Sequence, residues 1–152
     1  MDVRIRHLTT LDEYNAAVDL QYETWGAGFG AGVPAAILMV SQKVGGITGG
    51  AFTPDGRMVG CVFGITGIRD GAPAHWSDIL AVTPEFRGTG LGKRLKWFQR
   101  DELLKAGVRT MYWTYDPLQA LNANLNINTL RARPVEYIVN MYGDTGSDLH
   151  AG

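Results

Sequence analysis

The sequence predicts a single domain of the α/β (α+β) class, in which helices flank a central sheet. Strand-like alternation and helix-like periodicity follow one another along the 152 residues. A glycine-rich turn also joins a buried strand directly to an amphipathic helix. The length suits one domain with a proper hydrophobic core.

The first third of the chain predicts one strand and two helices. Apolar and charged residues alternate over Val3–Leu8, which indicates a strand. Thr10–Glu13 has the pattern of a capping box, so a helix begins there and runs to Trp25, before a series of glycines. Pro34 can start the second helix.

The middle of the chain predicts three strands. Two of them, around Ile47–Phe52 and Met58–Ile65, form a hairpin because Thr53–Gly56 between them has turn chemistry. The third strand, around Trp76–Val82, leads into the glycine-rich turn.

The last third predicts a helix, a strand, a short helix and a final strand. The first helix follows the glycine-rich turn and ends near Gly107. The other three elements are expected around Thr110–Tyr115, Leu118–Leu130 and Val135–Tyr142.

Composition sets bounds on partners and compartment. The net charge of −1 implies no bulk attraction to nucleic acid or to a membrane, so neither is expected as a partner. The N-terminus is not a signal peptide and no stretch is long enough to span a bilayer, so we expect a cytoplasmic protein. Cys61 lies in an apolar run and is expected to be buried. His7, His75 and His150 are scattered, and no metal site is suggested.

The glycine-rich turn between the third of these strands and the next helix is the most informative feature. Such a turn leaves backbone N–H groups at a helix N-terminus without intrahelical partners, and these groups with the helix dipole favour an anion. Gly90 and Gly92 would let a phosphate approach the backbone without meeting a Cβ.

Several interpretations of this turn compete. A Walker A loop would need a glycine at Arg87 and a Ser or Thr at Arg94. A dinucleotide-binding fingerprint would need its third glycine at Lys93. The pattern Arg-x-x-Gly-x-Gly, formed by Arg87, Gly90 and Gly92, does fit. A tight turn without any ligand is the remaining interpretation.

The pattern Arg-x-x-Gly-x-Gly resembles the acyl-CoA pyrophosphate loop of the GNAT acetyltransferases. Other pieces of the chain, in the same order, are similar to an uncharacterised GNAT subfamily, and the resemblance covers nearly the whole sequence. These pieces are Trp25-Gly26, Val33-Pro34, Gly45–Phe52, His75–Asp78, Trp113–Leu118 and Tyr142-Gly143.

The resemblance implies a mixed, mostly antiparallel sheet whose fourth and fifth strands splay apart. Residues 1–143 would form the acyltransferase domain and 144–152 a polar, glycine-rich tail. Because the similar proteins continue past Tyr142, this chain looks C-terminally truncated and is expected to lack the last strand of the family. The edge of the strand at Val135–Tyr142 would then be unpaired, which predicts a homodimer or larger assembly.

The resemblance also implies that acetyl-CoA is the acyl donor. Its pantetheine arm would lie in the wedge between the splayed strands, beside Leu80, Ala81 and Val82. The pyrophosphate would lie on the backbone amides of the loop, which consists of Arg87, Gly88, Thr89, Gly90, Leu91, Gly92 and Lys93.

Asp78 is the first candidate for the base that accepts a proton from the attacking amine. In regular alternation Trp76, Asp78, Leu80 and Val82 would share one face of the strand, and partial desolvation there would raise the pKa of Asp78. The alternative is that Asp78 caps a turn or pairs with an arginine. His75 is the second candidate and should point to the other face.

Many GNAT enzymes use a tyrosine to protonate the departing thiolate, and the matching position here is Asn126. An amide cannot serve as that acid. Either Tyr115 or Tyr137 replaces it, or the thiolate leaves unassisted. The four asparagines at 122, 124, 126 and 128 either line a polar pocket or cap and solvate a weak helix.

Three functions follow from these observations. The first is an N-acyltransferase that transfers acetyl from acetyl-CoA to an amine not identified by the sequence. The second is a CoA-binding module of the same fold with little catalysis. The third is a nucleotide-phosphate protein, against which the arginine at position 94 argues because it leaves no Ser or Thr for Mg²⁺.

Overall fold

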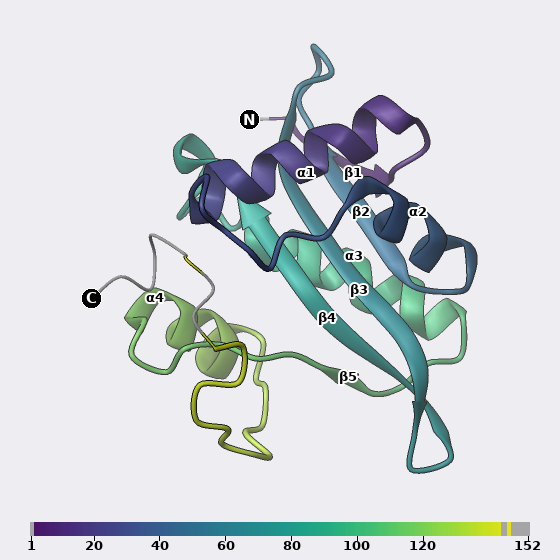
Figure 1. The fold of residues 1–152 in the computed structure, drawn as a ribbon, viewed down its shortest axis with the longest axis vertical. Coiled ribbons are helices and arrows are strands. Elements are labelled where there is room, and N and C mark those ends of the chain that lie inside the picture. The colour runs from purple at the N-terminus through teal and green to yellow at the C-terminus, as the bar shows by residue number, and fades with distance from the viewer. Residues whose placement is uncertain (1, 144–145, 147–152) are drawn as a thin grey trace.

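The computed structural model describes residues 2–143 and residue 146, which form a twisted sheet with helices on both faces (Figure 1). The strands stand side by side in chain order, from β1 to β5. Neighbouring strands are antiparallel, except that β4 and β5 are parallel. The strands are β1 (Arg4–His7), β2 (Ile47–Phe52), β3 (Met58–Arg69), β4 (Ala72–Val82) and β5 (Met111–Tyr112).

Two helices cover one face of the sheet and a third covers the other (Figure 1). α1 (Leu11–Trp25) and α2 (Ala35–Lys43) lie on the first face, and α3 (Leu91–Lys105) lies on the second. A 3₁₀ turn, η1 (Pro84–Phe86), precedes α3. After β5, the short helix α4 (Ala120–Ala123) continues as the π-helical turn η2 (Asn124–Thr129).

The start of α1 is tied to the first strand. The side chain of Thr10 accepts a hydrogen bond from the backbone N–H of Glu13, as a helix N-cap should. The carboxylate of Glu13 also pairs with the guanidinium of Arg6 on β1 at 2.6 Å. This contact lowers the pKa of Glu13 to about 2. Glu13 therefore links the start of α1 to β1 and orients the helix on the sheet.

Apolar side chains form a core on each face of the sheet. On the α1 and α2 face, Tyr14, Leu38 and Phe63 are buried together with Cys61. Burial raises the pKa of the Cys61 thiol to about 12, which confirms the expected buried cysteine. On the α3 face, buried residues of the sheet and of η1 pack against Leu91 and Leu95.

The predicted elements are confirmed as far as α3, and the short helix expected around Leu118–Leu130 is found as α4 and η2, whereas the two strands expected after α3 differ. β5 is shorter than the strand expected over Thr110–Tyr115. The strand predicted at Val135–Tyr142 is wrong, because this segment has no regular secondary structure. A strand needs a partner along its length, and β5 offers only two paired residues. Most of the tail, 144–145 and 147–152, lies outside the described residues. No helix in the described part is long and apolar enough to cross a membrane.

Candidate functional site

β4 and β5 form a wedge because they pair only at one end. The pairing joins His75 to Met111 and Trp76 to Tyr112, whereas β4 continues to Val82. From Ser77 onward, the edge of β4 on this side therefore has no strand partner among the described residues. Backbone donors and acceptors along such an edge are available to a ligand. The wedge confirms the expected splaying of these strands.

The glycine-rich loop lies at the open end of the wedge, where β4 passes into α3. Gly90 has φ 84°, a left-handed conformation that suits glycine, and α3 begins at the next residue. Within the described part of the chain, the amides of Leu91, Gly92 and Lys93 donate to no backbone or side-chain acceptor. Arg87 holds the loop against the strand, since its Nε donates to the carbonyl oxygen of Val82 at 3.0 Å.

Gly92 leaves a narrow slot beside the helix N-terminus. A Cβ at this position would lie 3.8 Å from Cδ2 of Leu80 and 3.9 Å from Cδ2 of Leu125. The slot is therefore bounded by β4, by the first turn of α3 and by η2. A side chain added at position 92 would therefore contact Leu80 and Leu125 from its Cβ outward.

A β-bulge interrupts β4 at Asp78. Gly64 of β3 pairs with Ser77 and Phe63 pairs with Ile79, so Asp78 has no partner on β3. The extra residue reverses the side-chain alternation beyond it. The predicted common face of Trp76, Asp78, Leu80 and Val82 is therefore wrong.

The two sides of β4 beyond the bulge can be assigned from their contacts. Leu80 and Val82 are half-buried against the α3 core. Ile79 and Ala81 are buried in the core under α1 and α2. Leu80, Ala81 and Val82 are the residues expected beside the pantetheine arm. Because the side chain of Ala81 is buried in the core under α1 and α2, only its backbone could contact such an arm.

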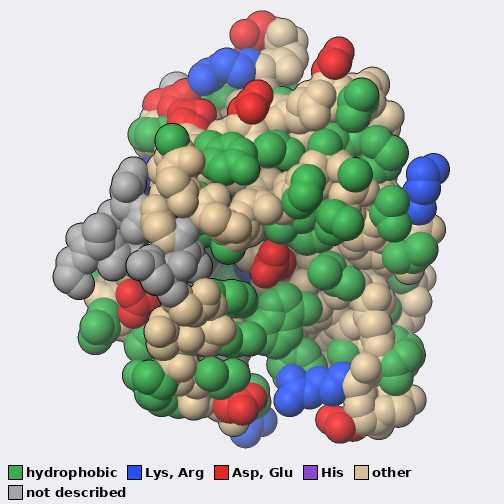
Figure 2. Space-filling model, in the orientation of Figure 1, with side chains coloured by type: hydrophobic (Ala, Val, Ile, Leu, Met, Phe, Trp, Pro, Cys, Tyr) green, Lys and Arg blue, Asp and Glu red, His purple; other side chains and the backbone are tan. Residues whose placement is uncertain are grey.

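The side chain of Asp78 is exposed, and surrounding protein still raises its pKa by desolvating the charged form. No hydrogen bond or ion pair involving this side chain occurs among the described residues. The alternative in which Asp78 caps a turn or pairs with an arginine is therefore not seen there. The space-filling view shows a hollow on the α1 and α2 face, bordered by hydrophobic side chains and by an acidic side chain (Figure 2).

His75 is fully buried on the α3 side of the sheet. Its Nδ1 lies 2.8 Å from Oγ1 of Thr66, and its Nε2 lies 3.0 Å from Nε2 of Gln99. Burial and the positive charge of Lys96 lower the pKa of His75 to about 4. A neutral, fully buried ring with both nitrogens engaged is suited to positioning β4.

Lys96 is the polar residue at this site that the sequence reasoning missed. The sequence singled out no role for it, yet the structure buries it, leaving only 4% of it exposed. Its Nζ donates to Oγ of Ser77 at 2.6 Å and lies 4.6 Å from the ring centroid of Trp113. Burial lowers the pKa of Lys96 to about 7. Its spacing from Gly92 and Leu103 places it on the buried stripe of the helix, and this spacing could have identified it.

The asparagines of α4 and η2 mainly bind one another and the neighbouring backbone. Oδ1 of Asn126 accepts from Nε1 of Trp113 at 2.6 Å, and its Nδ2 donates to the carbonyl oxygen of Asn122 at 2.9 Å. Nδ2 of Asn128 donates to Oδ1 of Asn124 at 2.8 Å. These bonds favour the interpretation that the amides stabilise a weak helix.

The two candidate acids lie in different surroundings. Tyr115 is half-buried two residues after Trp113, close in sequence to the end of β5. Tyr137 is 78% exposed in the irregular C-terminal segment. Of the two, Tyr115 is the closer in sequence to β5, which forms one side of the wedge.

Comparison with known proteins gives similarity in structure alone. No protein-family model matches the chain, and no curated protein matches its sequence. Among solved structures, an acetyltransferase of Trypanosoma brucei superposes with a TM-score of 0.69 at 19% identity, covering 91% of this chain and 97% of that one.

Two further structures extend this similarity. An aminoglycoside acetyltransferase from an uncultured soil metagenomic sample, solved with sisomicin, has a TM-score of 0.73 at 16% identity and covers 92% of this chain and 94% of its own. Glucosamine-6-phosphate N-acetyltransferase of Arabidopsis thaliana has a TM-score of 0.69 at 14% identity, with coverages of 95% and 100%. At these identities the comparison establishes the fold, which is the one expected from the sequence.

Proposed function

We propose that this protein, which has the GNAT acetyltransferase fold, is an acyl-CoA-dependent N-acyltransferase that transfers acetyl from acetyl-CoA to an amine. One observation carries the proposal: the amides of Leu91, Gly92 and Lys93, which donate to no acceptor among the described residues, lie at the open end of the β4–β5 wedge. An anion site and an adjacent unpaired strand edge are together what a pyrophosphate with an amide-containing arm requires.

The donor would be held mainly by backbone. The amides from Arg87 to Lys93 would bind the pyrophosphate, and the free edge of β4 at Leu80–Val82 would pair with the amides of the pantetheine arm. The side chain of Lys93, which stacks on Trp97 with Nζ 4.4 Å from the ring centroid, adds positive charge beside the loop. The arm would then run from the loop toward the apex of the wedge.

The acceptor amine would attack the thioester carbon directly in a ternary complex. As the C–N bond forms, Asp78 accepts a proton from the amine nitrogen, directly or through a water molecule. The raised pKa of this carboxylate makes it a stronger base than an ordinary aspartate.

The departing thiolate takes the electron pair of the C–S bond and needs a proton. We assign this proton to Tyr115, because the amide of Asn126 cannot supply one and is committed to Trp113 and Asn122. His75 is assigned a positioning role because both of its ring nitrogens are engaged inside the protein.

We propose that the acceptor is a primary amine. Similar folds were solved with the aminoglycoside sisomicin and with a CoA analogue of acetylneamine, and another acts on glucosamine 6-phosphate. A panel of aminoglycosides, amino-sugar phosphates and peptides is therefore the appropriate first screen, with release of the CoA thiol as the readout.

A second candidate function is a CoA-binding module with little catalysis. The observation that favours it is Asn126, a buried amide at the position where the resemblance expects an acid. Calorimetry separates the possibilities when acetyl-CoA, CoA and ATP are titrated in parallel. Saturable binding of acetyl-CoA with thiol release supports the enzyme, binding without any turnover supports the module, and tighter binding of ATP would contradict both.

We also propose that the chain forms a homodimer or larger assembly through its C-terminal segment. Although 135–142 is not a strand, its apolar side chains are exposed. At least 41% of the residue surface is accessible in each of Val135, Tyr137, Ile138, Val139, Met141 and Tyr142. The outer edge of β5 is also unpaired in the described part of the chain. Contiguous exposed apolar residues next to an open strand edge favour association.

A further inference from the structure

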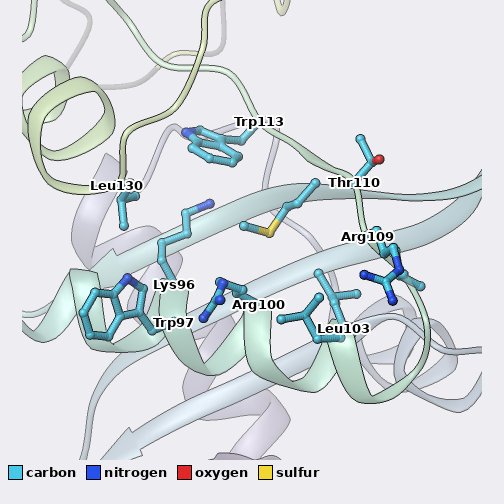
Figure 3. Close-up of a pocket in the computed structure, with 11 residues that line it drawn as sticks. Lys96, Trp97, Arg100, Leu103, Arg109, Thr110, Trp113 and Leu130 are labelled. Carbon is cyan, nitrogen blue, oxygen red and sulfur yellow. The ribbon is translucent and has the colours of Figure 1, made fainter.

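A cavity between α3 and β5 has not been assigned by the proposed function. Its volume is about 240 Å³, many times the volume that one water molecule needs. Lys96 and Trp113 face one another at its inner end, and Arg100 and Arg109 contribute guanidinium groups farther along (Figure 3). We call this cavity the Lys96 pocket.

The charged side chains that line the Lys96 pocket are all basic in the part of the chain that the structure describes. Three of its lining residues are cationic and, among the described residues that line it, none is acidic. Its walls are otherwise largely apolar and include Leu103 and Met111. A pocket of this kind selects a ligand with a short apolar body and a negative group.

Among the described residues, the buried ammonium of Lys96 has no anionic partner. It has three N–H donors, of which Ser77 uses one, and no carboxylate of the described residues lies within ion-pair distance of it. The pKa of Lys96 is lowered because burial disfavours the charged form of the side chain. A carboxylate or comparable anion in the pocket would supply the missing partner.

The Lys96 pocket meets the wedge at its apex. Ser77 and Trp113 are the first residues after β4 and β5 stop pairing, and Lys96 contacts both. An arm that runs down the wedge from the glycine loop would end at this point. Arg100 lies one helical turn beyond Lys96, about 6 Å farther along the axis of α3. The pocket is therefore placed to receive whatever the arm carries at its end.

We propose that the Lys96 pocket binds the acyl group of the donor and selects one that ends in a carboxylate, as in succinyl-CoA. This inference rests on the proposed function, because it needs the CoA arm in the wedge. Within the acyl-CoA-dependent function, it specifies that a short dicarboxylic acyl-CoA binds more tightly than a donor whose acyl group lacks the carboxylate. The apolar walls contact the methylene groups, and Lys96 pairs with the terminal carboxylate, with Arg100 and Arg109 adding to the positive potential.

The test compares donors that differ in one group. Succinyl-CoA and butyryl-CoA have the same chain length and differ in the terminal carboxylate. Calorimetry at pH 6.5 with both donors, together with acetyl-CoA and CoA, should show succinyl-CoA binding about ten- to a hundredfold more tightly than butyryl-CoA. Lys96→Met should remove or reverse this preference. Lys105→Met, an exposed change on the same helix outside the pocket, should keep it.

Arg100→Met provides a second variant if Lys96→Met does not fold, since Arg100 is exposed. It should weaken succinyl-CoA about three- to tenfold and leave butyryl-CoA unchanged. Equal affinity of the wild type for succinyl-CoA and butyryl-CoA would overturn the inference while leaving the proposed function standing. Failure of CoA and every acyl-CoA to bind would instead overturn the proposed function. If free succinate binds without competing with succinyl-CoA, the anion site lies away from the position of the acyl group, and the assignment of the Lys96 pocket to that group is overturned.

Discussion

Nδ1 of His75 donates a hydrogen bond to Oγ1 of Thr66, 2.8 Å away on the neighbouring strand. The direction follows from the next bond, since the Thr66 hydroxyl donates its own hydrogen to the carbonyl oxygen of Gly45 at 2.7 Å. Nε2 of His75 must then accept from the amide of Gln99. This chain of bonds keeps the imidazole neutral and joins β4, β3 and α3 beside the wedge.

The neutral imidazole makes stability depend on pH. The pKa of His75 is lowered from 6.5 to about 4, so the unfolded chain binds this proton at a higher pH than the folded one. The stabilisation is present above pH 6.5 and is lost as the pH falls toward 4, by up to about 3 kcal/mol. Denaturant unfolding at pH 7.5, 6, 5 and 4 should show a flatter dependence for His75→Gln. Parallel curves for the two proteins would contradict this.

Substitution of Gly92 tests the donor site. Gly92→Val should weaken acetyl-CoA binding at least tenfold, because the side chain would fill the slot between Leu80 and Leu125. Gly90→Val is less informative, since the positive φ at that position would also strain the turn. Ala36→Val, at an exposed second position of α2, is the matched control and should bind normally. Unchanged affinity in a folded Gly92→Val protein would refute the loop assignment.

Asp78→Asn tests the proposed base. Turnover should fall about 10²–10⁴-fold with acetyl-CoA affinity retained. In the wild type the rate should rise with pH through the pKa of Asp78, which lies above its usual value, and the variant should lack this acidic limb. Asp101→Asn, an exposed change on α3, should leave both the rate and its pH profile as they are. A near-normal rate in the Asp78 variant would contradict this assignment and indicate that a chain of bound waters accepts the proton.

The Lys96 pocket predicts a pH dependence of donor affinity. Lys96 faces Ser77 and His75 from β4 and Trp113 beyond β5, with Arg100 on its own helix. His75 is neutral above pH 4, so Lys96 is the group among these that titrates near pH 7. Only its protonated form attracts a carboxylate. Succinyl-CoA affinity should therefore fall as the pH rises above about 7, by up to tenfold per unit, whereas butyryl-CoA affinity should stay nearly constant.

Association through the C-terminal segment predicts concentration dependence. Light scattering over a dilution series should show a dimer or larger species that dissociates on dilution. Tyr137→Asp and Val139→Asp place charges on exposed residues and should yield a monomer with an unchanged thermal unfolding transition. A wild-type protein that stays monomeric at high concentration would rule this proposal out.

The elements up to α3 could be predicted from the sequence because their signals are local. The cap at Thr10, the turn at Thr53–Gly56 and the glycine at position 90 each act within a few residues, and each occurs where expected. The glycine-loop resemblance likewise identified the fold that the solved structures share. Periodicity failed at 135–142, because whether a strand forms depends on a partner supplied elsewhere in the chain.

The sequence by itself determined the order of the elements as far as α3 and the position of the glycine-rich turn, since both depend on neighbouring residues in the chain. Only the tertiary structure decided the faces of β4, because the bulge at Asp78 is defined by its pairing with β3. It also decided that Lys96 is buried and His75 neutral. Burial and pKa depend on contacts between residues distant in sequence, and no local pattern specifies those contacts.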